Sequence, residues 1–191
     1  MIYYYAVNQV GKVEGGFYST DSISQLGSFS PGCVAIESEL DIFAMNPGKF
    51  IYYDFGLSDF VALDKPASYM VFDYVTKQWS DSRTLDEIKA QKWTEIKQQR
   101  EQLEFGGFEF EGNIYDSDQV SQGRIMGAAL AGVDQVWTLA DNTTVELSAT
   151  QLHQLYATLQ AHIASAHARG RIARLAIDNA LTKEDIEAVQ L

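Results

Sequence analysis

The chain has 191 residues, of which 46% are hydrophobic and 21% charged, so it can form one large domain or two small ones with ordinary globular cores. Its formal net charge is −12, and its dense group of cations is confined to Arg169, Arg171 and Arg174. A nucleic-acid-binding protein needs a basic face to neutralise phosphates. We therefore exclude nucleic acid as the main partner.

Cysteine usage and hydropathy predict a protein made in a reducing, aqueous compartment. Cys33 is the only cysteine, so the chain has no internal disulfide and no cysteine metal cluster. The opening residues, MIYYYAVNQVGK, lack a basic stretch followed by an apolar stretch. No apolar run approaches the roughly 20 residues that cross a bilayer. We expect no signal peptide, no membrane association, and assembly in a cytoplasm.

Residues 1–66 predict a small β-rich module. Short runs of aromatic and branched residues, bounded by glycine, proline and asparagine, favour strands. These runs are residues 2–7, 17–19, 33–36, 49–55 and 60–63. A short helix capped by Asp21 is expected over 21–26, and a helical turn is expected over 39–45.

The first of these strands carries aromatic side chains on both faces. Side chains alternate along a strand, so Tyr3 and Tyr5 share one face and Tyr4 takes the other. One interpretation is a central strand whose aromatic rings pack in the core. The other is a docking edge that pairs with another chain by strand addition.

Residues 67–83 predict a β-hairpin that connects the module to the C-terminal half of the chain. Residues 68–74 alternate partly, Thr76-Lys77 forms a turn, and Gln78-Trp79 returns. Two short strands are marginally stable alone, so this hairpin must pack on the module before it or on the helix after it. We place the domain boundary near Pro66.

Residues 84–191 predict a mainly helical domain with short hairpins near 105–115 and 136–147, which makes the whole chain α+β. Capping boxes begin two helices, at Thr84 with Glu87 and at Ser148 with Gln151. The second of these helices repeats apolar residues at i, i+3, i+4 and i+7, and Gly170 permits a break or kink within it. A short final helix follows Thr182.

A further helix is expected from about residue 117, capped by Asp116 with Gln119 as its partner. Gly123, Gly127 and Ala131 recur along it at i, i+4 and i+8. Small residues at this spacing allow close approach of two backbones. We therefore predict that this stripe packs tightly in the core.

The titratable residues do not predict an active site or a metal site. His153, His162 and His167 are separated by nine and five residues, so they do not converge on one helical face. Asp116 and Asp118 lack the downstream ligands of a calcium loop. Cys33 is expected to be a structural thiol. We expect no enzymatic activity, no metal and no cofactor.

Several segments resemble tail proteins of tailed bacteriophages. Segments similar to that family are Phe72-Asp73-Tyr74, residues 76–89 (where Ser82 replaces a common proline), residues 92–97 with Arg100, residues 104–110, residues 115–118 and residues 136–142. Together with the helix after Ser148 they cover about residues 69–180. The block that begins at Glu104 looks like the start of a C-terminal domain of unknown function common in those proteins, and residues 136–142 with the helix after Ser148 look like its remainder. Tyr3-Tyr4 and Gly16-Phe17-Tyr18 resemble the opening of tail-fibre assembly proteins.

The resemblance implies a non-enzymatic tail protein, made in the host cytoplasm and located in the virion tail. It would attach to the tail fibre or baseplate as a structural adaptor and form a homo-oligomer. The alternative is a tail-fibre assembly chaperone absent from the mature virion. A glycan hydrolase, with Glu109, Glu111 and Asp116 as candidate carboxylates, is the outside alternative. The expected partner-binding residues are the aromatic residues Tyr3, Tyr4, Tyr5, Phe17, Tyr18, Tyr52, Tyr53 and Trp93.

Overall fold

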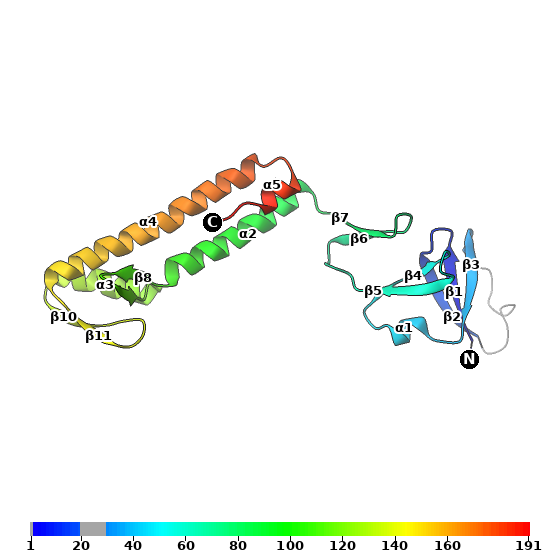
Figure 1. Cartoon of the computed structure of the whole chain (residues 1–191), viewed down its shortest axis with the longest axis horizontal. Coiled ribbons are helices and arrows are strands. Elements are labelled where there is room, and N and C mark those ends of the chain that lie inside the picture. The colour runs from blue at the N-terminus through cyan, green and yellow to red at the C-terminus, as the bar shows by residue number, and fades with distance from the viewer. Residues whose placement is uncertain (1, 20–29) are drawn as a thin grey trace. The chain divides into compact units, whose positions relative to one another are not determined.

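The computed structural model describes residues 2–19 and 30–191, so the helix expected over 21–26 lies outside the described residues. The chain divides into two compact units, Met1–Ser82 and Arg83–Leu191. The first consists mainly of strands, and the second of helices with short hairpins, which confirms the α+β class (Figure 1). Most of the segment expected to be a connecting hairpin, residues 67–83, is part of the first unit.

The first unit begins with an antiparallel sheet in which β1 (Ile2–Asn8) lies between β2 (Val13–Ser19) and β3 (Cys33–Ser38). Residues 3–7 of β1 are paired with both neighbours. Strand addition requires a free edge, so the interpretation of the first strand as a docking edge is wrong. A strand with neighbours on both sides buries its aromatic side chains instead.

A short helix, α1 (Ile42–Met45), and two antiparallel hairpins complete the first unit. The hairpins are β4 (Phe50–Asp54) with β5 (Asp59–Leu63), and β6 (Met70–Asp73) with β7 (Gln78–Asp81). Buried Phe72 joins them, because its ring centroid lies 4.7 Å from that of Phe50 and 4.9 Å from that of Tyr52. Neither hairpin stands alone, as expected for two-stranded pieces.

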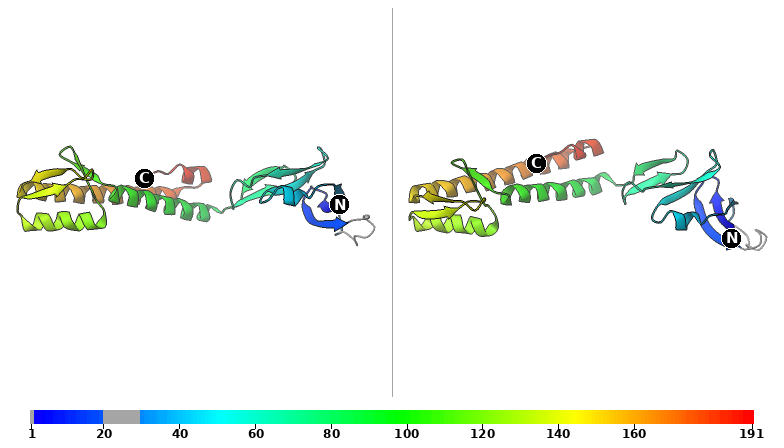
Figure 2. Two further views of the ribbon diagram at one scale, coloured as in Figure 1. Left: turned by 90° about the horizontal axis from the view of Figure 1, so that it is seen from below. Right: turned by 60° about the horizontal axis from the view of Figure 1, so that its bottom comes forward.

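The second unit is organised by two long antiparallel helices, α2 (Leu85–Phe105) and α4 (Ala149–Asn179), which lie side by side in every view (Figures 1 and 2). Their seam is aliphatic: Ile96 packs against Ala173 and Ile177. The short helix α5 (Lys183–Glu187) closes one end through Ile186, which clusters with Ile88. Both predicted capping boxes are confirmed.

Gly170 does not interrupt α4, which runs unbroken through that position. A methyl group built there would lie 3.1 Å from Cδ of Arg100 on α2. The break that a glycine permits does not occur here, and the glycine instead lets the Arg100 stem pass close to the α4 backbone.

The other end of the second unit holds its short elements. They are β8 (Phe108–Phe110), β9 (Asn113–Tyr115), α3 (Gln119–Ala131), β10 (Gln135–Thr138) and β11 (Thr144–Leu147). Phe108, Tyr115 and Ile125 form one core with the buried leucines of α4. This core holds two hairpins and α3 against a single long helix.

The structure corrects two expectations about α3. Its N-cap is Asp118 rather than Asp116, since the Asp118 carboxylate accepts hydrogen bonds from the backbone N–H groups of Val120 and Ser121. The stripe of Gly123, Gly127 and Ala131 is exposed, not packed in the core. Ile125, Ala128 and Ala129 form the buried face instead. The small residues spaced four positions apart therefore lie on the solvent-exposed side of this helix.

Candidate functional site

The eight aromatic residues predicted to bind a partner do not form one surface. Seven belong to the first unit, whereas Trp93 lies in the second, beneath the Arg174 guanidinium at 5.1 Å from its ring centroid. Tyr4, Tyr5 and Tyr52 are buried, and Tyr3, Tyr53 and Trp93 are partly buried. Phe17 and Tyr18 belong to β2, but their side chains are outside the described part of the chain. The buried tyrosines contribute to the interior of the first unit.

Three hairpin turns of the first unit meet around a hollow of about 280 Å³. Val10 comes from the turn between β1 and β2, Phe55 from that between β4 and β5, and Val75 from that between β6 and β7. All three side chains are exposed, Phe55 by 46% and Val75 by 76%. We call Val10, Phe55, Tyr74, Val75 and Lys77 the hairpin-tip surface.

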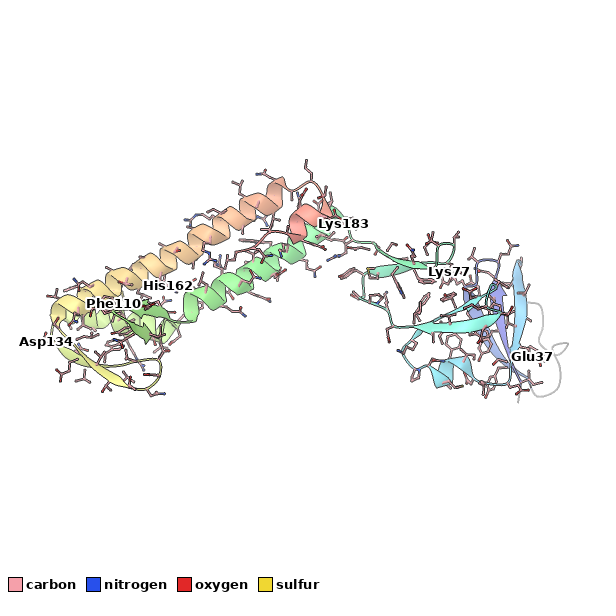
Figure 3. All side chains as sticks on the ribbon, viewed as in Figure 1. Glu37, Lys77, Phe110, Asp134, His162 and Lys183 are labelled. Carbon is pink, nitrogen blue, oxygen red and sulfur yellow. The ribbon has the colours of Figure 1, made fainter. Side chains whose placement is uncertain are left out.

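Interactions between the turns hold the hairpin-tip surface in place. Lys77, labelled in Figure 3, donates a hydrogen bond from Nζ to the carbonyl oxygen of Val10 (2.8 Å), and the same Nζ lies 4.7 Å from the Tyr52 ring centroid. The backbone N–H of Tyr53 donates to the carbonyl oxygen of Gly11 (2.9 Å). Buried Tyr52 and half-buried Tyr53 thus support this surface from behind without forming it.

Aspartates fix two of these turns internally. Asp54 accepts hydrogen bonds from the N–H groups of Gly56 and Leu57, and Asp73 accepts from those of Val75 and Thr76. The backbone N–H groups of Thr76 and Val75 lower the pKa of Asp73 below its ordinary value. Such turns pre-order the apolar tips, which reduces the entropy lost on binding.

Val10, Phe55 and Val75 are not predicted from the sequence because each sits singly in a turn. The aromatic runs that stand out in the sequence lie inside strands, and strands bury such runs. The available signal is that a large apolar residue occupies each of three turns, where polar residues are usual. Which turns come together, however, depends on the tertiary fold.

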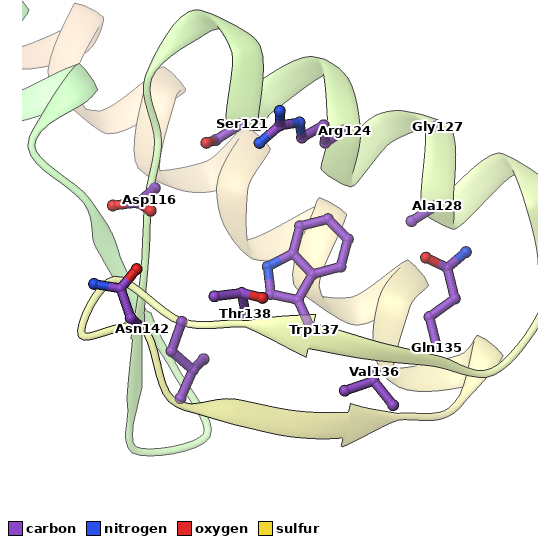
Figure 4. A pocket seen from close by; sticks show the side chains of 11 residues that line it. Asp116, Ser121, Arg124, Gly127, Ala128, Gln135, Val136, Trp137, Thr138 and Asn142 are labelled. Carbon is purple, nitrogen blue, oxygen red and sulfur yellow. The ribbon is translucent and has the colours of Figure 1, made fainter.

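A second hollow, of about 550 Å³, lies in the second unit between α3 and β10 (Figure 4). Trp137 and Gln135 rise from β10 toward α3, where Arg124 lies opposite, and Asp116 and Asn142 are at one end. Ala128 and Leu139 form apolar parts of the wall. We call this hollow the α3–β10 groove.

The α3–β10 groove contains charges of both signs. Arg124 forms no ion pair within the described residues, although it faces the Asp118 cap closely enough to affect it. The hydrogen bond from the Ser121 hydroxyl is the main cause of the lowered pKa of Asp118, and the positive charge of Arg124 contributes. Asp116 supplies the carboxylate of the lining.

The carboxylates proposed for a glycan hydrolase do not converge on this groove. Asp116 lines it, whereas the Glu111 carboxylate accepts a hydrogen bond from Gln151 (2.9 Å) and Glu109 is exposed on β8. Glycoside hydrolysis uses two carboxyl groups across one cleft. Among the groove residues that the structure describes, one carboxylate is present.

The three histidines occupy separate environments. His162 donates from Nε2 to the carbonyl oxygen of Leu103 (2.9 Å) and stacks on Phe108, His167 lies 3.2 Å from the Glu104 carboxylate, and His153 is exposed. Cys33 is a half-buried free thiol. Within residues 2–19 and 30–191, no three histidine, cysteine or acidic side chains gather closely enough to hold a metal ion. None of the helices in these residues is long and apolar enough to cross a membrane.

These features define a two-unit α+β protein whose second unit is an antiparallel helix pair with short hairpins. The family described as Domain of unknown function (DUF4376) matches residues 87–190. This match spans more than half of the chain, and the protein belongs to that family. No curated protein and no solved structure matched the chain. The unknown-function domain indicated by the resemblance is therefore present, and it starts at residue 87 rather than at residue 104.

Proposed function

We propose that this protein is a non-enzymatic bacteriophage tail protein that attaches to the tail fibre or baseplate as a structural adaptor. The tail-protein resemblance over about residues 69–180 supports this role, and it overlaps the family match at 87–190. Two separate units suit an adaptor, because each can contact a different neighbour. Its site of action would be the virion tail, after synthesis in the host cytoplasm.

The hairpin-tip surface is the main structural observation that supports this proposal. Apolar side chains scattered singly over a surface need no explanation, but here three of them surround one hollow. Aromatic residues are favoured at protein interfaces, and Tyr74 and Phe55 both line this hollow. The first unit would therefore attach to the fibre or baseplate protein through its hairpin tips.

The second unit would contact another copy of the chain. On α4, Ile172 is 70% exposed and Leu175 is 62% exposed. Both lie on the side of α4 away from the seam with α2, because Gly170 and Ala173 take the buried side. An exposed pair of large aliphatic residues on a long helix supports a homo-oligomer.

The first experiment places a charge on the hairpin-tip surface in the genome that encodes the protein. Val75→Glu should remove most of the chain from purified particles, because it puts a carboxylate into an apolar contact. Val34→Glu is the matched control: Val34 is 51% exposed on β3 and does not line the hollow. Equal incorporation of both variants, measured by quantitative mass spectrometry, would refute attachment through the hairpin tips.

The same measurement on unaltered particles separates the adaptor from the chaperone. A fixed ratio of this chain to the fibre protein supports a virion adaptor. Absence from virions, with abundance in infected-cell lysate, would make the chain an assembly factor. Deletion of residues 1–82 should abolish both particle incorporation and fibre attachment, and unchanged particles would contradict either role.

A further inference from the structure

The α3–β10 groove has the size and the chemistry of a ligand site that the adaptor role does not use. Its volume of about 550 Å³ lies within the range of roughly 300–1,000 Å³ typical of small-molecule sites. It is formed wholly within the second unit, from α3, β10 and the neighbouring turns. The nature of its lining then limits what it can bind.

The lining of the groove combines one aromatic ring system with many hydrogen-bonding groups. The Trp137 indole extends from β10 into the space below α3 (Figure 4). Around it lie polar side chains that donate and accept hydrogen bonds: Arg124, Gln135, Asn142, Asp116 and Thr138. A lining rich in polar groups suits a ligand with many hydroxyl groups better than a flat, apolar one.

The charged side chains in and near the groove favour a neutral ligand over an anion or a cation. Asp116 in the lining, and Asp118 beside Arg124, oppose an anion such as a phosphate. The Arg124 guanidinium opposes a cation. The protein's net charge of −12 further disfavours anionic ligands.

An exposed glycine keeps the groove open. A side chain at Gly127 would meet no atom within 4 Å, so packing does not require a glycine there. Glycine within a helix costs roughly 0.5–1 kcal/mol relative to alanine. Its absent side chain leaves the α3 backbone bare along the groove, where a ligand can approach closely.

From these features we propose that the α3–β10 groove binds a neutral saccharide. The C–H face of a sugar ring packs on the electron-rich face of the Trp137 indole. Its hydroxyl groups exchange hydrogen bonds with Arg124, Asp116 and the amides of Gln135 and Asn142, which lie around the ring. The groove would bind sugar without cleaving it, because among its described residues it offers one carboxylate.

The test is a titration of the full chain followed by NMR of the tryptophan indole N–H groups. The chain has three tryptophans, and Trp137→Phe identifies the signal of the one in the groove. The probes are glucose, galactose, mannose and N-acetylglucosamine, each added to about 10 mM so that a dissociation constant near 1 mM is detected. At least one of them should shift the Trp137 signal in a saturable way.

Two glycines of α3 provide a matched pair of variants. Gly127→Leu fills the groove and should weaken saccharide binding by at least about tenfold. Gly123→Leu adds the same side chain one turn earlier. The space there is also free, but Gly123 does not line the groove. It should bind like the unaltered protein. Both variants should fold, because leucine is a better helix former than glycine.

Each other outcome overturns the proposal. If no saccharide moves the Trp137 signal, the groove is not a sugar site. If glucuronate or adenosine binds more tightly than every neutral sugar, the ligand class is wrong. If Gly123→Leu and Gly127→Leu weaken binding equally, the sugar does not occupy the groove.

Discussion

The two units of this protein keep their interiors together in different ways. In the first, aromatic rings pack against one another at the base of hairpins, as Phe72 does against Phe50, Tyr52, Tyr74 and Trp79. In the second, the buried leucines of α4 pack against the hairpins and α3, and an aliphatic seam joins α4 to α2. The first unit leaves apolar hairpin turns exposed around one hollow, whereas the second unit leaves a polar groove between α3 and β10.

Because the two interiors differ, we expect the units to unfold separately, and Phe72→Ala should give the largest effect. It removes a buried ring that contacts four others, so it should lower the free energy of unfolding of the first unit by about 3–5 kcal/mol. The helical signal of the second unit should be unchanged. Urea unfolding followed by far-ultraviolet circular dichroism and by tryptophan fluorescence distinguishes the two transitions.

Ile96→Ala is the reciprocal variant, because Ile96 is fully buried in the helix seam. It should destabilise the second unit by about 2–5 kcal/mol and leave the first unit unaffected. If either substitution shifts both transitions by the same amount, the units are one cooperative body and their interiors are not independent.

A smaller effect is expected from the buried polar link in the second unit. The Ser117 hydroxyl donates to the carbonyl oxygen of Glu104 (2.6 Å) and accepts from the N–H of Gly107 (2.9 Å). Ser117→Ala leaves both groups without this partner and should cost about 1–3 kcal/mol. Ser121→Ala is the control, since its hydroxyl bonds the exposed Asp118 carboxylate. Thermal unfolding in which both variants match the parent would show that this link contributes nothing.

Tyr115 presents the opposite case, a buried polar atom without a partner. Its ring is 1% exposed, and its hydroxyl has no hydrogen-bond partner among the described residues. Burial also raises the pKa of this hydroxyl, so the group stays neutral. Tyr115→Phe removes an uncompensated donor and should leave stability unchanged or raise it by about 1 kcal/mol. A loss above about 1 kcal/mol would reveal that a hidden partner exists.

The sequence predicted most of the architecture because its signals are local. Capping boxes at Thr84 and Ser148 fixed where the long helices begin, and strand runs ended at their turn residues. The errors came from positions whose roles depend on neighbours distant in sequence. The spacing of Gly127 predicts a core position, but this residue is exposed, and the first strand allows an edge position, but it is central in its sheet. Spacing alone cannot say which side of a helix or strand another element covers.

The candidate surfaces were harder to predict for the same reason. Val10, Phe55 and Val75 are 45 and 20 residues apart in sequence, and only the folded hairpins bring them around one hollow. The sequence predicts a strand around Trp137, but the position of this residue opposite Arg124 depends on how β10 packs near α3. The aromatic content of the sequence indicates a partner-binding surface, whereas burial in the folded protein determines which aromatic side chains remain exposed to a partner.

The smallest expected effect is the pH dependence of the stability that the Asp118 N-cap of α3 contributes beside the groove. Hydrogen bonds from Ser121 lower the pKa of Asp118, so the ionised carboxylate contributes stability above the ordinary aspartate pKa of about 3.9. That contribution is lost as pH falls through the lowered pKa of the folded state. Asp118→Asn keeps a good N-cap without this titration. The stability difference between the parent and Asp118→Asn should therefore change in favour of the variant below about pH 3.9, as measured by urea unfolding of the second unit across that range. A stability difference that stays constant with pH would mean that the Asp118 charge does not stabilise α3. The interactions of this carboxylate with Ser121 and Arg124 would then contribute nothing to the stability of the second unit.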